Sequence, residues 1–119
     1  MELRQAIAEK LRKENGIDIK SENEILVTAG ASEAVMLTVL TVLDPGDEIL
    51  IPEPMYLFYL DLGEYAGART IPLPLSPNDG FQITREKLEK CITKKTKAIL
   101  LNSPHNPTGR VIPSSLFRK

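Results

Sequence analysis

The sequence predicts an α/β fold in which a mostly parallel sheet is covered by helices on both faces. Short, nearly continuous apolar runs recur along the chain, and segments with a helical pattern separate them. This alternation is typical of buried parallel strands joined by helices. No repeat, low-complexity tract or linker interrupts it, so we expect residues 1–119 to belong to one domain. The four apolar runs, our predicted strands, are residues 24–28, 48–51, 69–73 and 97–101.

The segments between and before these runs carry helix signals. Leucine and isoleucine recur at every fourth position in residues 3–11, and Gly16 follows a basic last turn, which predicts an amphipathic helix with a glycine stop. Gly67 is placed to end a later helix, and the Thr84 hydroxyl to cap another. These further helices are expected over residues 32–43, 55–65 and 84–91.

Length and charge narrow the range of functions. At 119 residues, the chain suffices for one core but is short for an enzyme that must enclose its ligands. The composition, 42% hydrophobic and 26% charged, is typical of a folded protein and not of a disordered one. Because 15 basic residues face 16 acidic ones, the chain lacks the basic excess that nucleic acid binding requires.

Signals for location are few. The single cysteine, Cys91, cannot form an internal disulfide and has no His or Cys cluster near it for a metal site, which favours a reducing, cytoplasmic setting. Residues 1–16 mix acidic with basic side chains, so we read no targeting segment there. The apolar run of residues 34–43 is well short of the roughly 20 residues that span a bilayer, and we expect no membrane segment.

A turn of small residues follows the first predicted strand. Gly30, Ala31 and Ser32 let backbone N–H groups approach an anion closely, and the start of a helix adds the positive end of its dipole. A phosphate group fits such a place. The alternative is an ordinary helix start, with Ser32 as the cap and Glu33 in the first turn. The glycine spacing matches neither a dinucleotide fingerprint nor a Walker loop.

An aromatic residue follows the second predicted strand. Pro54 fixes the backbone just before Tyr56, which places the ring at the mouth of the sheet as a stacking surface for a flat heterocycle. The alternative is core packing at the start of a helix, where Phe58 and Tyr59 lie close in sequence.

A rigid, amide-rich loop follows the fourth predicted strand. Two prolines and two asparagines in residues 102–109 cannot continue a strand, so the chain must turn and present Asn102 and Asn106 as hydrogen-bonding groups. His105 is the only histidine. We interpret it as an exposed loop residue in preference to a general base, since no acid or metal partner can be named for it.

Taken in order, three of these segments resemble the large domain of class I aminotransferases, the fold type I pyridoxal-phosphate family that includes the aspartate aminotransferases. The run ILVTAGASEAV is similar to the family's phosphate-binding segment, and DPGDEILIPEPMY to the stretch that ends in the ring-stacking aromatic. NSPHNPTG is similar to its Asn-Pro-Thr-Gly signature. The resemblance covers nearly the whole chain and implies that it is part of the large domain, incomplete at both ends.

The resemblance also implies roles for individual residues. Gly30, Ala31 and Ser32 would hold the phosphate of pyridoxal 5′-phosphate (PLP), Tyr56 would stack on its ring, and Asn106 would donate its side-chain amide to the phenolic oxygen. Asn102 and Pro107 would shape the loop. The implied substrates are an amino acid and a 2-oxo acid, and the implied assembly is a homodimer or another self-associated form. Related fold type I enzymes include lyases and synthases, and these residues do not separate the reactions.

One departure from the family pattern concerns the lysine that bonds to the cofactor. None of the lysines in this sequence lies in a setting like that of the family's lysine, which follows the Asn-Pro-Thr-Gly loop. No catalytic residue is therefore assigned, and we expect the 119 residues alone to be inactive. Two other hypotheses stay open: a non-catalytic truncated or interacting fragment, and a small phosphate- or nucleotide-binding α/β domain that uses only the Gly30 turn.

Overall fold

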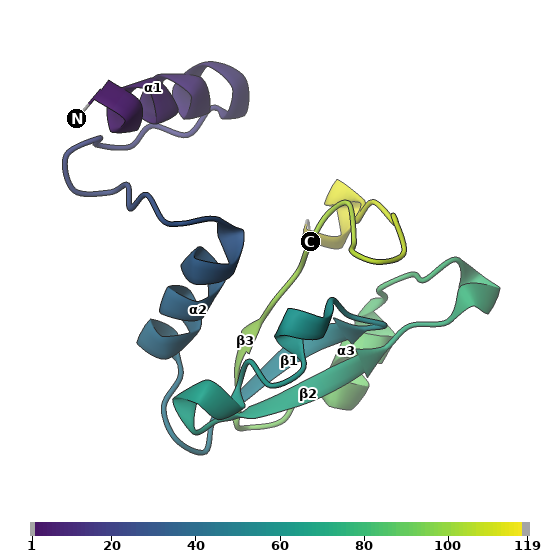
Figure 1. The fold of residues 1–119 in the computed structure, drawn as a ribbon. Coiled ribbons are helices and arrows are strands. Elements are labelled where there is room, and N and C mark those ends of the chain that lie inside the picture. The colour runs from purple at the N-terminus through teal and green to yellow at the C-terminus, as the bar shows by residue number, and fades with distance from the viewer. Residues whose placement is uncertain (1, 118–119) are drawn as a thin grey trace. The chain divides into compact units, whose positions relative to one another are not determined.

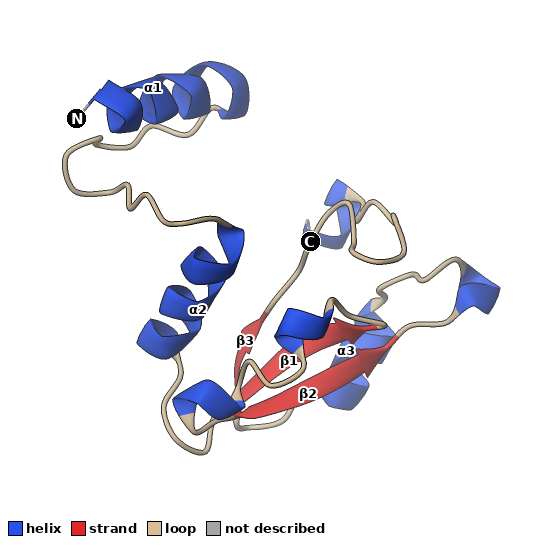
Figure 2. Ribbon diagram, viewed as in Figure 1, coloured by secondary structure: helices blue, strands red, loops and turns tan. Residues whose placement is uncertain are grey.

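The computed structural model describes residues 2–117, which divide into two compact units, the first ending at Val35 and the second beginning at Met36. The boundary falls inside the helix α2 (Ala31–Val42), and each unit is described by itself. Figure 1 follows the chain through its elements, and Figure 2 shows which segments are helix and strand. Within residues 2–117, no helix is both long and apolar enough to cross a membrane.

The first unit begins with the predicted amphipathic helix. Helix α1 (Glu2–Lys10) continues into a wider π-helical turn (Leu11–Asn15), and Gly16 ends it in the left-handed conformation at φ 68°. Its backbone N–H bonds to the carbonyl of Leu11. The glycine stop read from the sequence is confirmed, because few other residues adopt this conformation without strain.

The strand expected over residues 24–28 does not form. Residues 25–28 have no regular secondary structure and pair with no strand of the described chain, and Leu26 is 75% exposed. An apolar β-branched run becomes a strand only when a neighbour supplies the ladder of hydrogen bonds. The predicted strand at residues 24–28 is therefore wrong.

The second unit is built on a parallel sheet of three strands in the order β2-β1-β3. The strands are β1 (Glu48–Glu53), β2 (Arg69–Pro74) and β3 (Thr96–Ile99). In the register, Leu50 of β1 lies between Ile71 of β2 and Ile99 of β3. Leu50 is fully buried, as expected for the central strand of a parallel sheet. The predicted α/β class with a parallel sheet and helices is confirmed.

A helix connects the two outer strands. Helix α3 (Arg85–Cys91) lies between β2 and β3 in sequence and packs against β2; Figure 2 shows it behind the sheet. Thr84 caps it as predicted, because its hydroxyl oxygen accepts the N–H of Lys87 at 3.3 Å. The cap satisfies one of the N–H groups that the first helical turn leaves unpaired.

The helix expected over residues 55–65 is replaced by two short 3-10 turns, Leu57–Tyr59 and Glu64–Ala66. Gly63 explains the break. A Cβ atom built on it would lie 2.7 Å from the carbonyl carbon of Arg69 and 2.8 Å from the nitrogen of Thr70. The chain passes so close to the start of β2 here that only glycine fits, and the predicted stop at Gly67, with φ 70°, is confirmed.

Candidate functional site

The carboxyl ends of β1 and β3 lie at the same edge of the sheet. The strands are parallel neighbours, and beyond the end of β3 the N–H of Leu100 still donates to the carbonyl of Leu50 at 2.9 Å. Open α/β sheets bind ligands at this edge, where the loops leave the strands. The segments that carry Tyr56 and the two asparagines therefore start side by side.

The loop after β3 is fixed by its own side chains. The Oδ1 atom of Asn102 accepts the backbone N–H of Asn106 at 2.8 Å, and the hydroxyl of Ser103 accepts the N–H of Ile112 at 3.0 Å. Asn102 is half-buried, whereas Asn106 is exposed. The structure thus brings the two predicted asparagines together. Asn102 stabilises the loop through its side chain, and Asn106 presents an exposed amide.

His105 is buried, not exposed as predicted. Its exposed fraction is 5%, and its Nδ1 atom lies 2.8 Å from the hydroxyl oxygen of Thr108. Burial lowers the pKa of the imidazole below its ordinary value, because a charged ring would lose its hydration. The contact between His105 and Thr108 was not predicted from the sequence. The available signal was a threonine three residues after the histidine and just before Gly109, since side chains in tight turns often bond within the turn.

Tyr56 lies just beyond β1 and is 45% exposed, so the alternative of core packing does not describe it. Its ring meets that of Tyr59 edge-on, with centroids 5.6 Å apart, and lies 6.5 Å from the ring of Phe58. This edge-on contact is a favourable aromatic geometry.

The small-residue turn lies in the first unit. Gly30 has φ 91°, α2 begins at Ala31, and Ser32 is its second residue, so the alternative of Ser32 as the cap is wrong. The carboxylate of Glu33 instead accepts the N–H of Ala29. Among the described residues, the N–H groups of Ala31 and Ser32 have no hydrogen-bond partner, as expected in a first helical turn.

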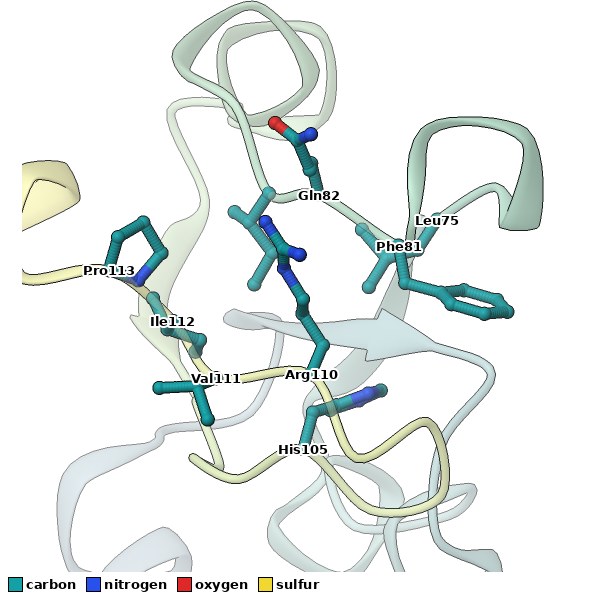
Figure 3. Close-up of a pocket in the computed structure, with 9 residues that line it drawn as sticks. Leu75, Phe81, Gln82, His105, Arg110, Val111, Ile112 and Pro113 are labelled. Atoms are coloured by element: carbon teal, nitrogen blue, oxygen red, sulfur yellow. The ribbon is translucent and has the colours of Figure 1, made fainter.

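A cavity of about 30 Å³ lies beside the His105 loop (Figure 3). The loop of residues 75–83 lines it on one side and residues 105–113 on the other, with Arg110 and Gln82 as polar groups. The volume has room for a water molecule but not for a coenzyme. Among residues 2–117, no group of three or more His, Cys, Asp or Glu side chains is placed to hold a metal ion.

In the second unit, an exposed phenol ring follows β1 and the exposed amide of Asn106 follows β3. In the first unit, the N–H groups of the first two residues of α2 are unpaired among the described residues. The model for class I and II aminotransferases matches residues 1–119. The chain belongs to this family.

Individual relatives of this aminotransferase segment agree. It is 46% identical over 110 residues to the aspartate aminotransferase of Musicola paradisiaca, covering 92% of this chain and 28% of that protein. With the probable aspartate/prephenate aminotransferase of Thermus aquaticus it shares 40% identity over 98% of this chain and 30% of the other. The predicted family membership is confirmed, and the alternative of a separate phosphate- or nucleotide-binding domain is not favoured.

Solved structures give the same assignment. The aromatic aminotransferase from Pyrococcus horikoshii matches with a TM-score of 0.91 and 40% identity, over 97% of this chain and 31% of that one. The N-succinyldiaminopimelate aminotransferase from Mycobacterium tuberculosis matches with a TM-score of 0.89 and 42% identity, over 96% of this chain and 30% of the other. This aminotransferase segment therefore spans between 28% and 31% of the length of these relatives, whose family is PLP-dependent.

Proposed function

We propose that these residues form part of the PLP site of an enzyme that transfers an amino group between an amino acid and a 2-oxo acid. Support comes from the family match over residues 1–119 and from the loop in which Asn102 holds the backbone of Asn106. In this proposal, residues 1–119 belong to the large PLP-binding domain, and the enzyme works in the cytoplasm as a homodimer.

Each predicted residue has one task. The N–H groups of Ala31 and Ser32 donate to the phosphate at the positive end of the α2 dipole, and Gly30 lets the anion approach. The Tyr56 ring stacks on the flat face of the cofactor. When bound, PLP supplies an electron sink that stabilises the carbanion of the substrate.

Asn106 is the residue that orients the cofactor in this proposal. Its exposed side-chain amide can donate to the phenolic oxygen of the cofactor. Its backbone is fixed in position because its N–H donates a hydrogen bond to the Oδ1 atom of Asn102. A donor held at a fixed point costs little reorganisation when the ligand binds. Asn102 thus acts on the ligand only through Asn106.

Lys94 and Lys95 lie away from the proposed site. They precede β3, and the Lys95 carbonyl accepts the Glu48 N–H at 2.9 Å, at the edge of the sheet opposite to the Asn106 loop. Transamination needs a lysine amine that bonds to the cofactor and moves protons, and none of the lysines in this sequence has the setting of the family's lysine. We therefore expect the 119-residue polypeptide by itself to bind PLP weakly and without turnover.

The test is an NMR titration of the isotopically labelled chain. PLP and inorganic phosphate should both shift the backbone amides of Ala31 and Ser32, whereas only PLP should shift the side-chain amide of Asn106. Asn106→Ala should weaken PLP binding and leave phosphate binding unchanged; Asn78→Ala, at an exposed turn elsewhere, is the matched control. Shifts produced by a nucleotide but not by PLP would overturn the proposal.

A further inference from the structure

His105 is buried within a loop whose other residues are exposed or half-buried. Its exposed fraction is 5%, although the flanking residues Pro104 and Asn106 are exposed. Figure 3 shows the residue beside the cavity, on the same loop as Arg110. A polar ring is buried in a surface loop only when contacts offset the loss of hydration.

Both backbone groups of His105 are used within the loop. Its N–H donates to the carbonyl of Arg110 at 2.8 Å, and its own carbonyl accepts the N–H of Gly109 at 2.7 Å. Together with the contact of its ring to Thr108, these bonds close residues 105–110 into a compact turn. Every bond in the set has His105 at one end.

The contact between the ring and Thr108 depends on where the ring carries its proton. The Thr108 hydroxyl oxygen accepts the N–H of Arg110 at 3.3 Å, and its own proton can be donated. The Nδ1 atom of His105, 2.8 Å away, can accept that proton when the ring is neutral and protonated on Nε2. Burial lowers the pKa of the ring and so favours the neutral form.

Asn106 follows directly after this anchor. Its backbone N–H is held by Asn102, Pro107 limits the backbone on its other side, and its side chain has no hydrogen-bond partner among the described residues. We propose that His105, through its bond to Thr108, is a positioning residue that holds Asn106 in one orientation. The proposal rests on the proposed function, in which Asn106 binds the cofactor.

The experiment compares two pairs of variants of the labelled chain without any cofactor. Thr108→Ser keeps the hydroxyl and Thr108→Val removes it. His105→Asn keeps an acceptor near the Nδ1 position, whereas His105→Leu has none. The readouts are the hydrogen-exchange rate of the Asn106 N–H and the ring signals of His105, which is the only histidine. Thr41→Val is the matched control, because the Thr41 hydroxyl bonds only within α2, to Leu37.

Thr108→Val and His105→Leu should raise the exchange rate of Asn106 by about fivefold or more, which is the loss expected for one hydrogen bond. Thr108→Ser and His105→Asn should stay within about twofold of the parent chain, as should Thr41→Val. Thr108→Val should also shift the titration midpoint of the His105 ring, whereas Thr108→Ser should keep the midpoint of the parent chain.

An equal effect of both members of either pair would overturn the proposal, because His105 would then act only by filling space. If Thr108→Val prevents folding, the His105 pair decides the question alone. Because no cofactor is present, these rates do not depend on whether PLP binds. Loss of PLP binding alone, with the Asn106 rates as expected, would contradict the proposed function and not the positioning role.

Discussion

The side-chain oxygen of Asn102 accepts the backbone N–H of Asn106 at 2.8 Å, so the loop after β3 is braced by a residue at its own start. The hydrogen bond spans the three residues between them, which include Pro104. It connects the start of the loop to the residue for which we propose cofactor contact.

Asn102→Ala should loosen this loop. Removing the acceptor leaves the Asn106 N–H without its partner, and a hydrogen bond of this kind contributes about 1 kcal/mol. The exchange rate of the Asn106 N–H, followed by NMR, should rise by roughly fivefold. Asn102→Asp keeps an acceptor oxygen, so its exchange rate should stay near that of the parent chain. A faster rate in both variants would show that the Asn102 side chain does not stabilise the loop simply by accepting this hydrogen bond.

Gly63→Ala should destabilise the second unit strongly. The added methyl would meet the backbone of Arg69 and Thr70 at 2.7–2.8 Å, and backbone atoms cannot give way easily. We expect a loss of about 3 kcal/mol in the free energy of unfolding, measured with urea. The comparison is Gly46→Ala, where nothing lies within 4 Å and only the positive φ of 91° costs energy, about 1 kcal/mol. Equal losses would argue against the close approach at Gly63.

The buried carboxylate of Glu48 depends on a hydroxyl. Thr93 donates to its Oε2 atom at 2.6 Å, while Arg69 lies 3.9 Å from Oε1 and is 70% exposed. Thr93→Val should lower the free energy of unfolding by about 1–3 kcal/mol, because it leaves a buried oxygen without a partner. Thr93→Ser should retain most of the stability, and Arg69→Gln should cost about 0–1 kcal/mol because exposed ion pairs are weak. A larger effect for Arg69→Gln than for Thr93→Val would contradict this order.

Stability should fall as the pH drops from above to below 6.5, the ordinary pKa of histidine, and His105 should cause the fall. Burial holds the pKa of the folded imidazole below its ordinary value of 6.5. Below that pH the unfolded chain binds more protons than the folded one, so the free energy of unfolding decreases as the pH falls and levels off only beneath the folded pKa. Urea unfolding across this range should show the slope in the parent chain.

His105→Asn should remove the slope, since this is the only histidine. The carboxylates of Asp79 and Glu64 change the free energy of unfolding only at lower pH. Lys87 holds the pKa of Asp79 below its ordinary 3.8 through a side-chain hydrogen bond. Burial would raise the pKa of Glu64, but hydrogen bonds from its own backbone N–H and from Thr70 outweigh this and lower it below 4.5. Their stabilisation is lost only as the pH falls below these ordinary values. An unchanged slope in His105→Asn would show that another group titrates.

The elements that local patterns predicted well are those whose signals are complete within a few residues. Thr84 is followed at the right distance by the N–H it caps, and Gly16 and Gly67 end their helices in the left-handed conformation. The apolar runs of β1 and β2 indicated buried parallel strands because both faces of such a sheet are covered. The asparagine loop was equally readable, since prolines cannot continue a strand.

The predictions that failed depended on contacts that the local pattern of residue types does not show. Residues 25–28 have the composition of a strand, but pairing needs a neighbour that no local pattern reveals. The approach of Gly63 to Arg69 and Thr70 is set by where β2 starts, six residues later. His105 was predicted to be exposed because no acid or metal partner could be named for it, whereas its ring contacts the Thr108 hydroxyl and its backbone closes the turn at Arg110.

The measurement that tests the central claim most directly is segment replacement. The aligned 110 residues of this chain would replace their counterparts in the aspartate aminotransferase of Musicola paradisiaca, which is 46% identical to them. We predict that the hybrid binds PLP and transaminates, and that Asn106→Ala in the hybrid weakens PLP binding by about tenfold, as expected for loss of an oriented donor to a charged ligand. A folded hybrid that does not bind PLP, or whose affinity is indifferent to Asn106→Ala, would contradict the account.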